Sequence, residues 1–301
     1  MRTIIKEVFP VLLGILIPLA AFTTGLRAPR TEAGRLRLWR RPEQLARDLL
    51  AILVLVPLWA ILLVSVVPVA PIVRGGLLVA VLAVGIGPAA GMKRMGAAVP
   101  DAREALDLNL IVLVLSLVFV PIAFAAVAGL FHRDLHIGVG AVAKVVLGRA
   151  LLPLVLGLGA ARLVPNLAAK AGPVLAMVIN IVLLLVVVLA IAATWKFLRD
   201  VGGVGWLVAF AVAAGAVIIG HLLGGPEPGS RGVVAAASAM RFPALALVLA
   251  HVMPQGQRVI PVVLVYVVAA VLATTIYGAV MGRREKRERT GAPIHVLPQR
   301  A

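Results

Sequence analysis

Cysteine is absent from this 301-residue sequence, and acidic and aromatic residues are scarce. Without cysteine the chain forms no disulfide, no thiolate metal site and no thiol nucleophile. It has only 12 acidic residues and five scattered histidines, so we expect no metal site and no cofactor. The enzyme patterns H-E-x-x-H, G-x-S-x-G and D-D-x-x-D are also absent. These absences indicate a protein that is not an enzyme.

Long hydrophobic runs make up most of the sequence. Hydrophobic residues account for 62% of it, and several runs exceed the roughly 20 residues that span a bilayer core as a helix. Backbone groups in lipid must be paired within the protein, and the period-two alternation of a membrane barrel is absent, so these runs predict helices. The sequence therefore predicts an all-α membrane protein with about nine transmembrane helices. The expected spans cover residues 8–26, 45–67, 72–99, 104–130, 138–162, 173–195, 204–224, 230–253 and 258–281.

The distribution of positive charge predicts the orientation of the chain. The net charge is +17, and most Lys and Arg residues lie in alternate loops and in the C-terminal segment. This bias is typical of the positive-inside rule, and it favours contact with anionic lipid headgroups rather than with nucleic acid. We therefore expect a multi-pass cell-membrane protein with its N-terminus outside and its C-terminus in the cytoplasm. One transmembrane domain is predicted over residues 1–282, followed by a basic cytoplasmic tail over residues 283–301.

The first expected span is interpreted as a retained helix rather than a signal peptide. Its apolar run is long, and basic residues follow it instead of a cleavage site with small residues.

Two of the expected spans combine helix-breaking residues with positive charge. The first is the span over residues 72–99. A charged side chain near the bilayer centre costs roughly 2.5–3.5 kcal/mol, so charged residues at that depth usually mark a pathway or a ligand site. Gly and Pro in the same stretch would interrupt the helix and leave backbone groups free to meet a substrate. The alternatives are that the cations snorkel to the interface and that the prolines are ordinary kinks. The expected helix breaks and candidate substrate-binding cations of this stretch are Gly87, Pro88, Gly91, Lys93 and Arg94.

The second stretch contains Arg241 and Pro243, within the span expected over residues 230–253. We expect Pro243 to break the helix and Arg241 to contact the substrate. The alternative for Arg241 is a structural ion pair or the capping of free carbonyl groups. Asp107 and Asn109 are further candidates, although residues i and i+2 of a helix point apart. Asp107 has three interpretations: a pair with Arg94 or Arg241, a proton-coupling group, or an interfacial carboxylate.

The two interrupted spans occupy equivalent places in the chain. Each is the second span of a group of four, and the two groups start on opposite sides of the membrane. This arrangement predicts inverted repeats, an architecture in which the substrate lies near the bilayer midplane between broken helices.

Several motifs resemble those of a known transporter family. Thr23-Thr24-Gly25-Leu26 before a basic segment is similar to an F-x-M-G-L end of an early span. Lys144-Val145-Val146-Leu147 and the run from Leu151 to Leu158 are similar to a K-x-x-L-L-P-x-x-L-G-L helix. Through these motifs, nearly the whole chain resembles the bile acid:sodium symporter family. The resemblance implies two crossing helices in inverted repeats, and transport of an organic anion together with sodium.

The chain departs from the family at the residues that hold sodium. Where the family has C-P-G-G-T-A-S-N, the coordinating Ser and Asn fall on Gly91 and Met92, and a hydroxyl position of the next helix falls on Asn109. Where the family has E-V-G-M-Q-N, the run from Ala235 to Arg241 contains no carboxylate and no amide. Hard cations prefer several oxygen ligands, so sodium coupling through the usual residues is doubtful.

A cationic side chain can supply the positive charge that a bound sodium ion would otherwise supply to an anionic substrate. The guanidinium of Arg241 also has two donors whose spacing matches the two oxygens of an anionic group. The sequence therefore predicts a secondary transporter, or permease, for an organic anion that does not depend on sodium. The alternative is a transport-inactive membrane sensor or partner protein with the same fold.

Overall fold

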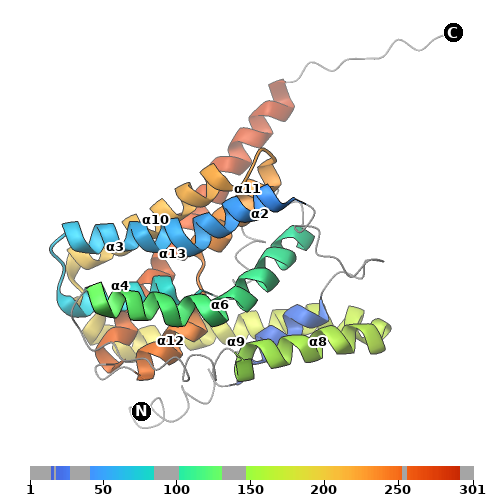
Figure 1. Ribbon diagram of the computed structural model, residues 1–301, viewed down its shortest axis with the longest axis horizontal. Helices are drawn as coiled ribbons and strands as arrows, with labels where there is room; N and C mark the ends of the chain where they lie inside the picture. The colour runs from blue at the N-terminus through green and yellow to red at the C-terminus, as the bar shows by residue number, and fades with distance from the viewer. Residues whose placement is uncertain are drawn as a thin grey trace.

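A computed structural model describes residues 15–16, 18–27, 41–84, 102–130, 147–252 and 256–291, and these ranges contain helices and no strand (Figure 1). A first helix covers residues 18–26. The helices that follow are α2 (Pro42–Leu49), the π-helical segment η2 (Leu50–Leu55), α3 (Val56–Val66), α4 (Pro71–Leu82), α6 (Ala102–Leu130), the π-helical segment η4 (Leu147–Leu151), α8 (Leu152–Leu163), α9 (Pro165–Asp200), α10 (Gly202–Leu223), α11 (Pro228–Ala239), α12 (Pro243–Val252) and α13 (Gly256–Gly291).

Proline marks the start of many of these helices. Pro42, Pro71, Pro228 and Pro243 are the first residues of α2, α4, α11 and α12. Proline suits this position because the first backbone N–H groups of a helix have no partner within it, and the fixed φ of proline is already helical. Much of the proline punctuation in the sequence therefore sets where helices begin.

The protein is membrane-embedded. Within the described ranges, the segments Pro42–Val66, Gly202–Leu223 and Arg258–Arg284 are long and apolar enough to cross a bilayer. Large apolar side chains such as Leu62 and Leu207 are exposed on these helices, which suits contact with lipid tails rather than water. The first of the three segments comprises α2, η2 and α3, so a π-helical segment lies within a membrane-crossing helix.

Helix α6 counts as a fourth crossing helix if its two arms form one span. The arms, Asp107–Ser116 and Val118–Val127, meet at an angle of 54°. Pro121 lies inside the helix and lacks the N–H group that would bond to the carbonyl of Leu117, and its ring crowds that carbonyl. The single span expected over residues 104–130 is therefore bent at its middle.

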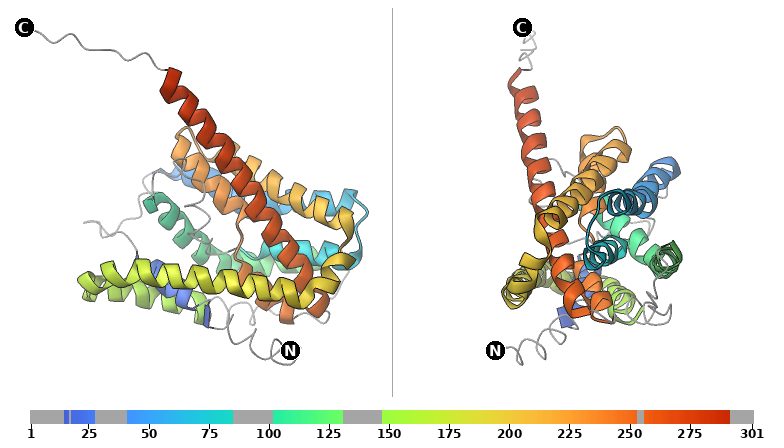
Figure 2. Two further views of the ribbon diagram at one scale, coloured as in Figure 1. Left: turned by 180° about the vertical axis from the view of Figure 1, so that it is seen from behind. Right: turned by 90° about the vertical axis from the view of Figure 1, so that its left-hand side faces the viewer.

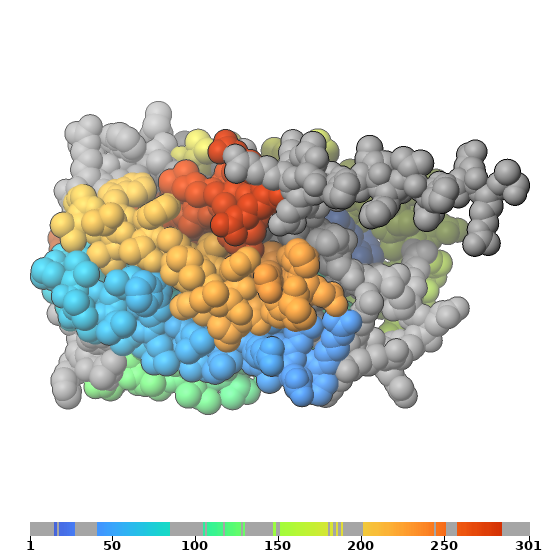
Figure 3. Space-filling view, turned by 90° about the horizontal axis from the view of Figure 1, so that it is seen from above, coloured from blue at the N-terminus to red at the C-terminus, as the bar shows by residue number. Residues whose placement is uncertain are grey.

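Helices α4 and α13 form the centre of the helix assembly. Helix α4 is buried on all sides from Gly76 to Leu82, and α13 is buried from Val262 to Tyr266. Helices α3 and α10 lie on one side of α4, while α8 and α9 lie on the other (Figure 1). Seen from above, the segment from α2 to α3 runs alongside α10 and α11 (Figure 3).

Helix α13 is longer than the span expected over residues 258–281. It continues without interruption to Gly291, and its C-terminal end projects beyond the other helices (Figure 2). The boundary expected at residues 282 and 283 is therefore not a break in the backbone. The first nine residues of the expected basic tail extend the same helix away from the membrane-embedded part.

Candidate functional site

The span expected over residues 230–253 is interrupted at residues 240–242. Helix α11 ends at Ala239, α12 begins at Pro243, and the three residues between them are not helical. Pro243 has no N–H to continue the hydrogen bonds of α11, and it disfavours helical geometry in the residue before it. The interruption thus leaves the C-terminal carbonyls of α11 and the N-terminal amides of α12 without hydrogen-bond partners inside their own helices.

The interruption contacts the end of α4 directly. Helix α4 ends at Leu82, and the carbonyl of Ala83 accepts a hydrogen bond from the backbone N–H of Phe242 at 3.0 Å. Two segments that are 159 positions apart in the sequence therefore meet where each stops being helical. The first charged stretch, with Gly87, Pro88, Gly91, Lys93 and Arg94, lies outside the described residues.

Arg241 is the buried cation of this interruption. Its side chain is 4% exposed, and its Nη1 donates a hydrogen bond to the backbone carbonyl of Ile52 at 3.0 Å. Its Nε and Nη2 have no hydrogen-bond partner among the described residues. Within the same ranges, Arg241 forms no ion pair with a carboxylate. The guanidinium is therefore held at Nη1, while the part of the chain that the structure describes offers no hydrogen-bond partner to Nε or Nη2.

A π-helical segment and a proline leave the Ile52 carbonyl available to Arg241. In a regular α-helix, the N–H of Val56 would bond to Ile52, but in η2 it bonds to the carbonyl of Ala51 instead. The next residue in π-helical register would be Pro57, which has no N–H. No backbone donor of the helix therefore reaches the Ile52 carbonyl, and the guanidinium takes that place.

The Pro57→Ala variant tests this account of the Ile52 carbonyl. Alanine restores an N–H and favours a regular helix, so the Ile52 carbonyl would turn back toward a backbone donor. We expect the Arg241 side chain to lose its fixed position and anion affinity to fall by roughly tenfold, as for one hydrogen bond to a charged group. The ligand-free protein should melt at the same temperature as the wild type or higher. Thermal melting with and without anion measures both effects, and Pro121→Ala in α6 is the matched control. A drop in melting temperature without any loss of affinity would contradict the account.

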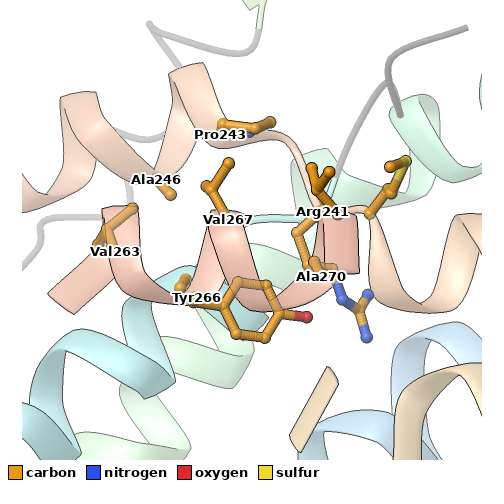
Figure 4. A pocket seen from close by; sticks show the side chains of 10 residues that line it. Arg241, Pro243, Ala246, Val263, Tyr266, Val267 and Ala270 are labelled. Atoms are coloured by element: carbon orange, nitrogen blue, oxygen red, sulfur yellow. The ribbon is translucent and has the colours of Figure 1, made fainter. Parts of the chain in front are cut away.

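Tyr266 contributes the second polar group at the interruption. Its hydroxyl donates a hydrogen bond to the carbonyl of Ala239 at 2.9 Å, and the same carbonyl accepts the backbone N–H of Arg241 at 3.0 Å, so this carbonyl at the end of α11 is paired. The hydroxyl also points toward the Arg241 guanidinium (Figure 4). The side chain is 2% exposed and lies on α13, so a central helix fixes the polar end of α11.

A small cavity lies against these two side chains (Figure 4). Its volume is about 30 Å³, enough for one or two water molecules or a group of similar size. Arg241 and Tyr266 are the lining residues with a charged or hydroxyl side chain, but the wall is almost wholly apolar, and the guanidinium lies beside the Tyr266 hydroxyl, away from Pro243 and Ala246 (Figure 4). The other lining residues are Ala80, Met240, Pro243, Ala246, Val263, Val267, Ala270 and Val271.

The other two candidates lie apart from this cavity. Asp107 and Asn109 are both buried on α6, with 9% and 7% exposure, but neither lines the cavity. Among the described residues Asp107 forms no ion pair with Arg241, and Arg94, the other partner considered for this carboxylate, lies outside them. Helix α6 packs against α11 and α4, so these two side chains belong to the surroundings of the interruption rather than to its centre.

The two helix ends bring opposite partial charges to the interruption. The C-terminus of α11 carries partial negative charge, which favours a guanidinium beside it. The N-terminus of α12 carries partial positive charge, which favours an anion. Sequence reasoning missed Ile52, Pro57 and Tyr266. Two features of the sequence could have indicated them. Pro57 lies in the middle of an apolar run, and Tyr266 is one of only two tyrosines in the chain.

No family model matches the sequence, and no curated protein matches it. The geometry around Arg241 is therefore the basis on which the function is inferred.

Proposed function

We propose that the protein is a secondary transporter for an organic anion. The observation that carries this proposal is a buried arginine at a helix break, with two nitrogens that have no acceptor among the described residues. A charge inside a membrane protein is expensive, so such residues usually pair with another group or mark a substrate pathway. An anionic substrate would supply the missing acceptors and the missing charge.

The contact between the end of α4 and the break between α11 and α12 supports a transporter architecture. The bond from Phe242 to Ala83 joins the end of α4 to the break between α11 and α12. Broken helices that meet at the centre of the bundle are the usual substrate site of transporters built from inverted repeats. We propose nine spans in two such repeats, similar to the bile acid:sodium symporters, with the N-terminus outside the cell and the C-terminus in the cytoplasm.

We also propose that transport does not require sodium. The segment from Ala235 to Arg241 provides no carboxylate or side-chain amide oxygen for a cation. The guanidinium of Arg241 already places a permanent positive charge at the break, and it would repel a metal ion bound beside it. The fixed charge thus takes the role that a bound cation has in a sodium-coupled carrier.

Uptake by proteoliposomes tests this function. Purified protein is reconstituted and offered a panel of labelled organic anions, with sodium on both sides or with choline in its place. We expect uptake of at least one anion, unchanged by choline, and no uptake by protein-free liposomes. Collapse of uptake in choline would show that sodium is required. Anions that raise the melting temperature but never cross the membrane would favour the transport-inactive sensor, and a panel that neither binds nor crosses would overturn the proposal.

A further inference from the structure

Among the described residues, the part of the Arg241 guanidinium that has no hydrogen-bond partner is one complete edge. Nη1 is bonded to the Ile52 carbonyl, and the two nitrogens without a partner are Nε and Nη2. In a guanidinium, the Nε–H and one Nη2–H are parallel and lie in one plane, and they form a fork with the spacing of two carboxylate oxygens. The free donors are therefore a matched pair rather than two unrelated atoms.

The Ile52 carbonyl keeps this edge free. A guanidinium rotates easily about its stem, and in water any of its edges can bind an anion. Here the acceptor on η2 fixes Nη1, so the opposite edge is the one left for a ligand. The two nitrogens are also sealed from solvent, so a ligand reaches them only when residues of the break move aside.

Among the described residues that line the cavity beside Arg241, no side chain supplies a third donor. The Tyr266 hydroxyl hydrogen is already donated to the Ala239 carbonyl. The remaining neighbours on the cavity wall are apolar side chains from α4, α12 and α13. A group with two oxygens would have both satisfied, whereas a group with three oxygens would bury one of them without a partner, which is unfavourable.

We infer that the ligand of Arg241 is a carboxylate, bound side-on by Nε and Nη2, and that the site discriminates against sulfonates. This inference rests on the proposed organic-anion transport and specifies its substrate class.

Pairs of anions with the same carbon skeleton test the inference. The pairs are propionate against ethanesulfonate and benzoate against benzenesulfonate, all fully charged at pH 7, with propionamide as the neutral control. The affinity of each anion is measured from the shift in melting temperature of the purified full-length protein. As a second readout, each anion is tested for inhibition of the uptake of the labelled anion that the proteoliposomes take up best. We expect the carboxylate of each pair to bind at least about tenfold more tightly, the effect of one unsatisfied buried oxygen.

The Arg241→Lys variant tests whether the fork is the cause. Lysine keeps the charge but not the planar pair of donors, so the preference should shrink to about threefold or less. Equal binding of carboxylate and sulfonate by the wild type would overturn the carboxylate inference and leave organic-anion transport standing. An unchanged preference in Arg241→Lys would overturn the role of the fork. Binding of neither kind of anion would overturn both proposals, and the wild-type comparison remains decisive if the variant does not fold.

Discussion

Replacing Arg241 with methionine is expected to abolish anion binding while leaving the ligand-free protein as stable as the wild type, or more stable. Methionine fills much of the same volume with an apolar chain. A buried charge without an ionic partner lowers stability, and replacing such charges with apolar residues is often neutral or stabilising by about 1–4 kcal/mol. The ligand, however, loses two hydrogen bonds to a charged group, each worth about 1.5–3 kcal/mol. We expect an affinity loss of at least 100-fold, roughly 2.7 kcal/mol.

The loss of anion affinity separates a binding arginine from a purely structural one. The methionine variant also leaves the Ile52 carbonyl unpaired, and this penalty of about 1–3 kcal/mol offsets part of the gain from removing the buried charge. Thermal melting and denaturant unfolding in detergent, each with and without anion, measure stability and affinity on the same sample. Arg162→Met, on the exposed surface of α8, controls for the loss of one positive charge. A destabilised methionine variant that still binds anions would assign Arg241 to the scaffold.

Introducing a methyl group at Gly220 is expected to separate α10 from α11. A Cβ at this glycine would lie 2.6 Å from the Cα of Ala235 and 2.6 Å from the carbonyl oxygen of Val234. Both atoms belong to the backbone of α11, which cannot rotate away as a side chain can. We expect Gly220→Ala to lower the free energy of unfolding by about 1–3 kcal/mol, the usual range for overpacking. Because α11 leads into Arg241, the variant should also weaken the response to anions.

Gly159 provides the matched control for this substitution. It lies inside α8, and nothing occupies the space within 4 Å of its missing Cβ. Gly159→Ala should therefore gain about 0.5–1 kcal/mol of helix stability and leave anion binding unchanged. Unfolding of both variants by denaturant in the same detergent gives the comparison. Similar free energies for the two variants would show that α10 and α11 do not need backbone contact at Gly220.

Much of the local structure around the site follows from the sequence. Pro243 in an apolar run predicts where a helix stops, and α11 and α12 do separate directly before it. Arg241 is close to this proline in the sequence, so its place at the interruption follows from the same pattern. The interpretation of Asp107 as a partner of Arg94 or Arg241 has no such local basis. The structure forms no pair with Arg241 among the described residues, and Arg94 lies outside them.

The amino-acid sequence by itself determined that the described chain is helical and membrane-embedded, because apolar segments in lipid must pair their own backbone groups. It also determined where proline ends or bends a helix. Only the tertiary structure decided which atoms Arg241 meets: Ile52 is 189 positions away, and Tyr266 lies on a different helix. The physical reason is that backbone pairing is a local requirement, whereas the partner of a buried charge depends on how distant helices pack.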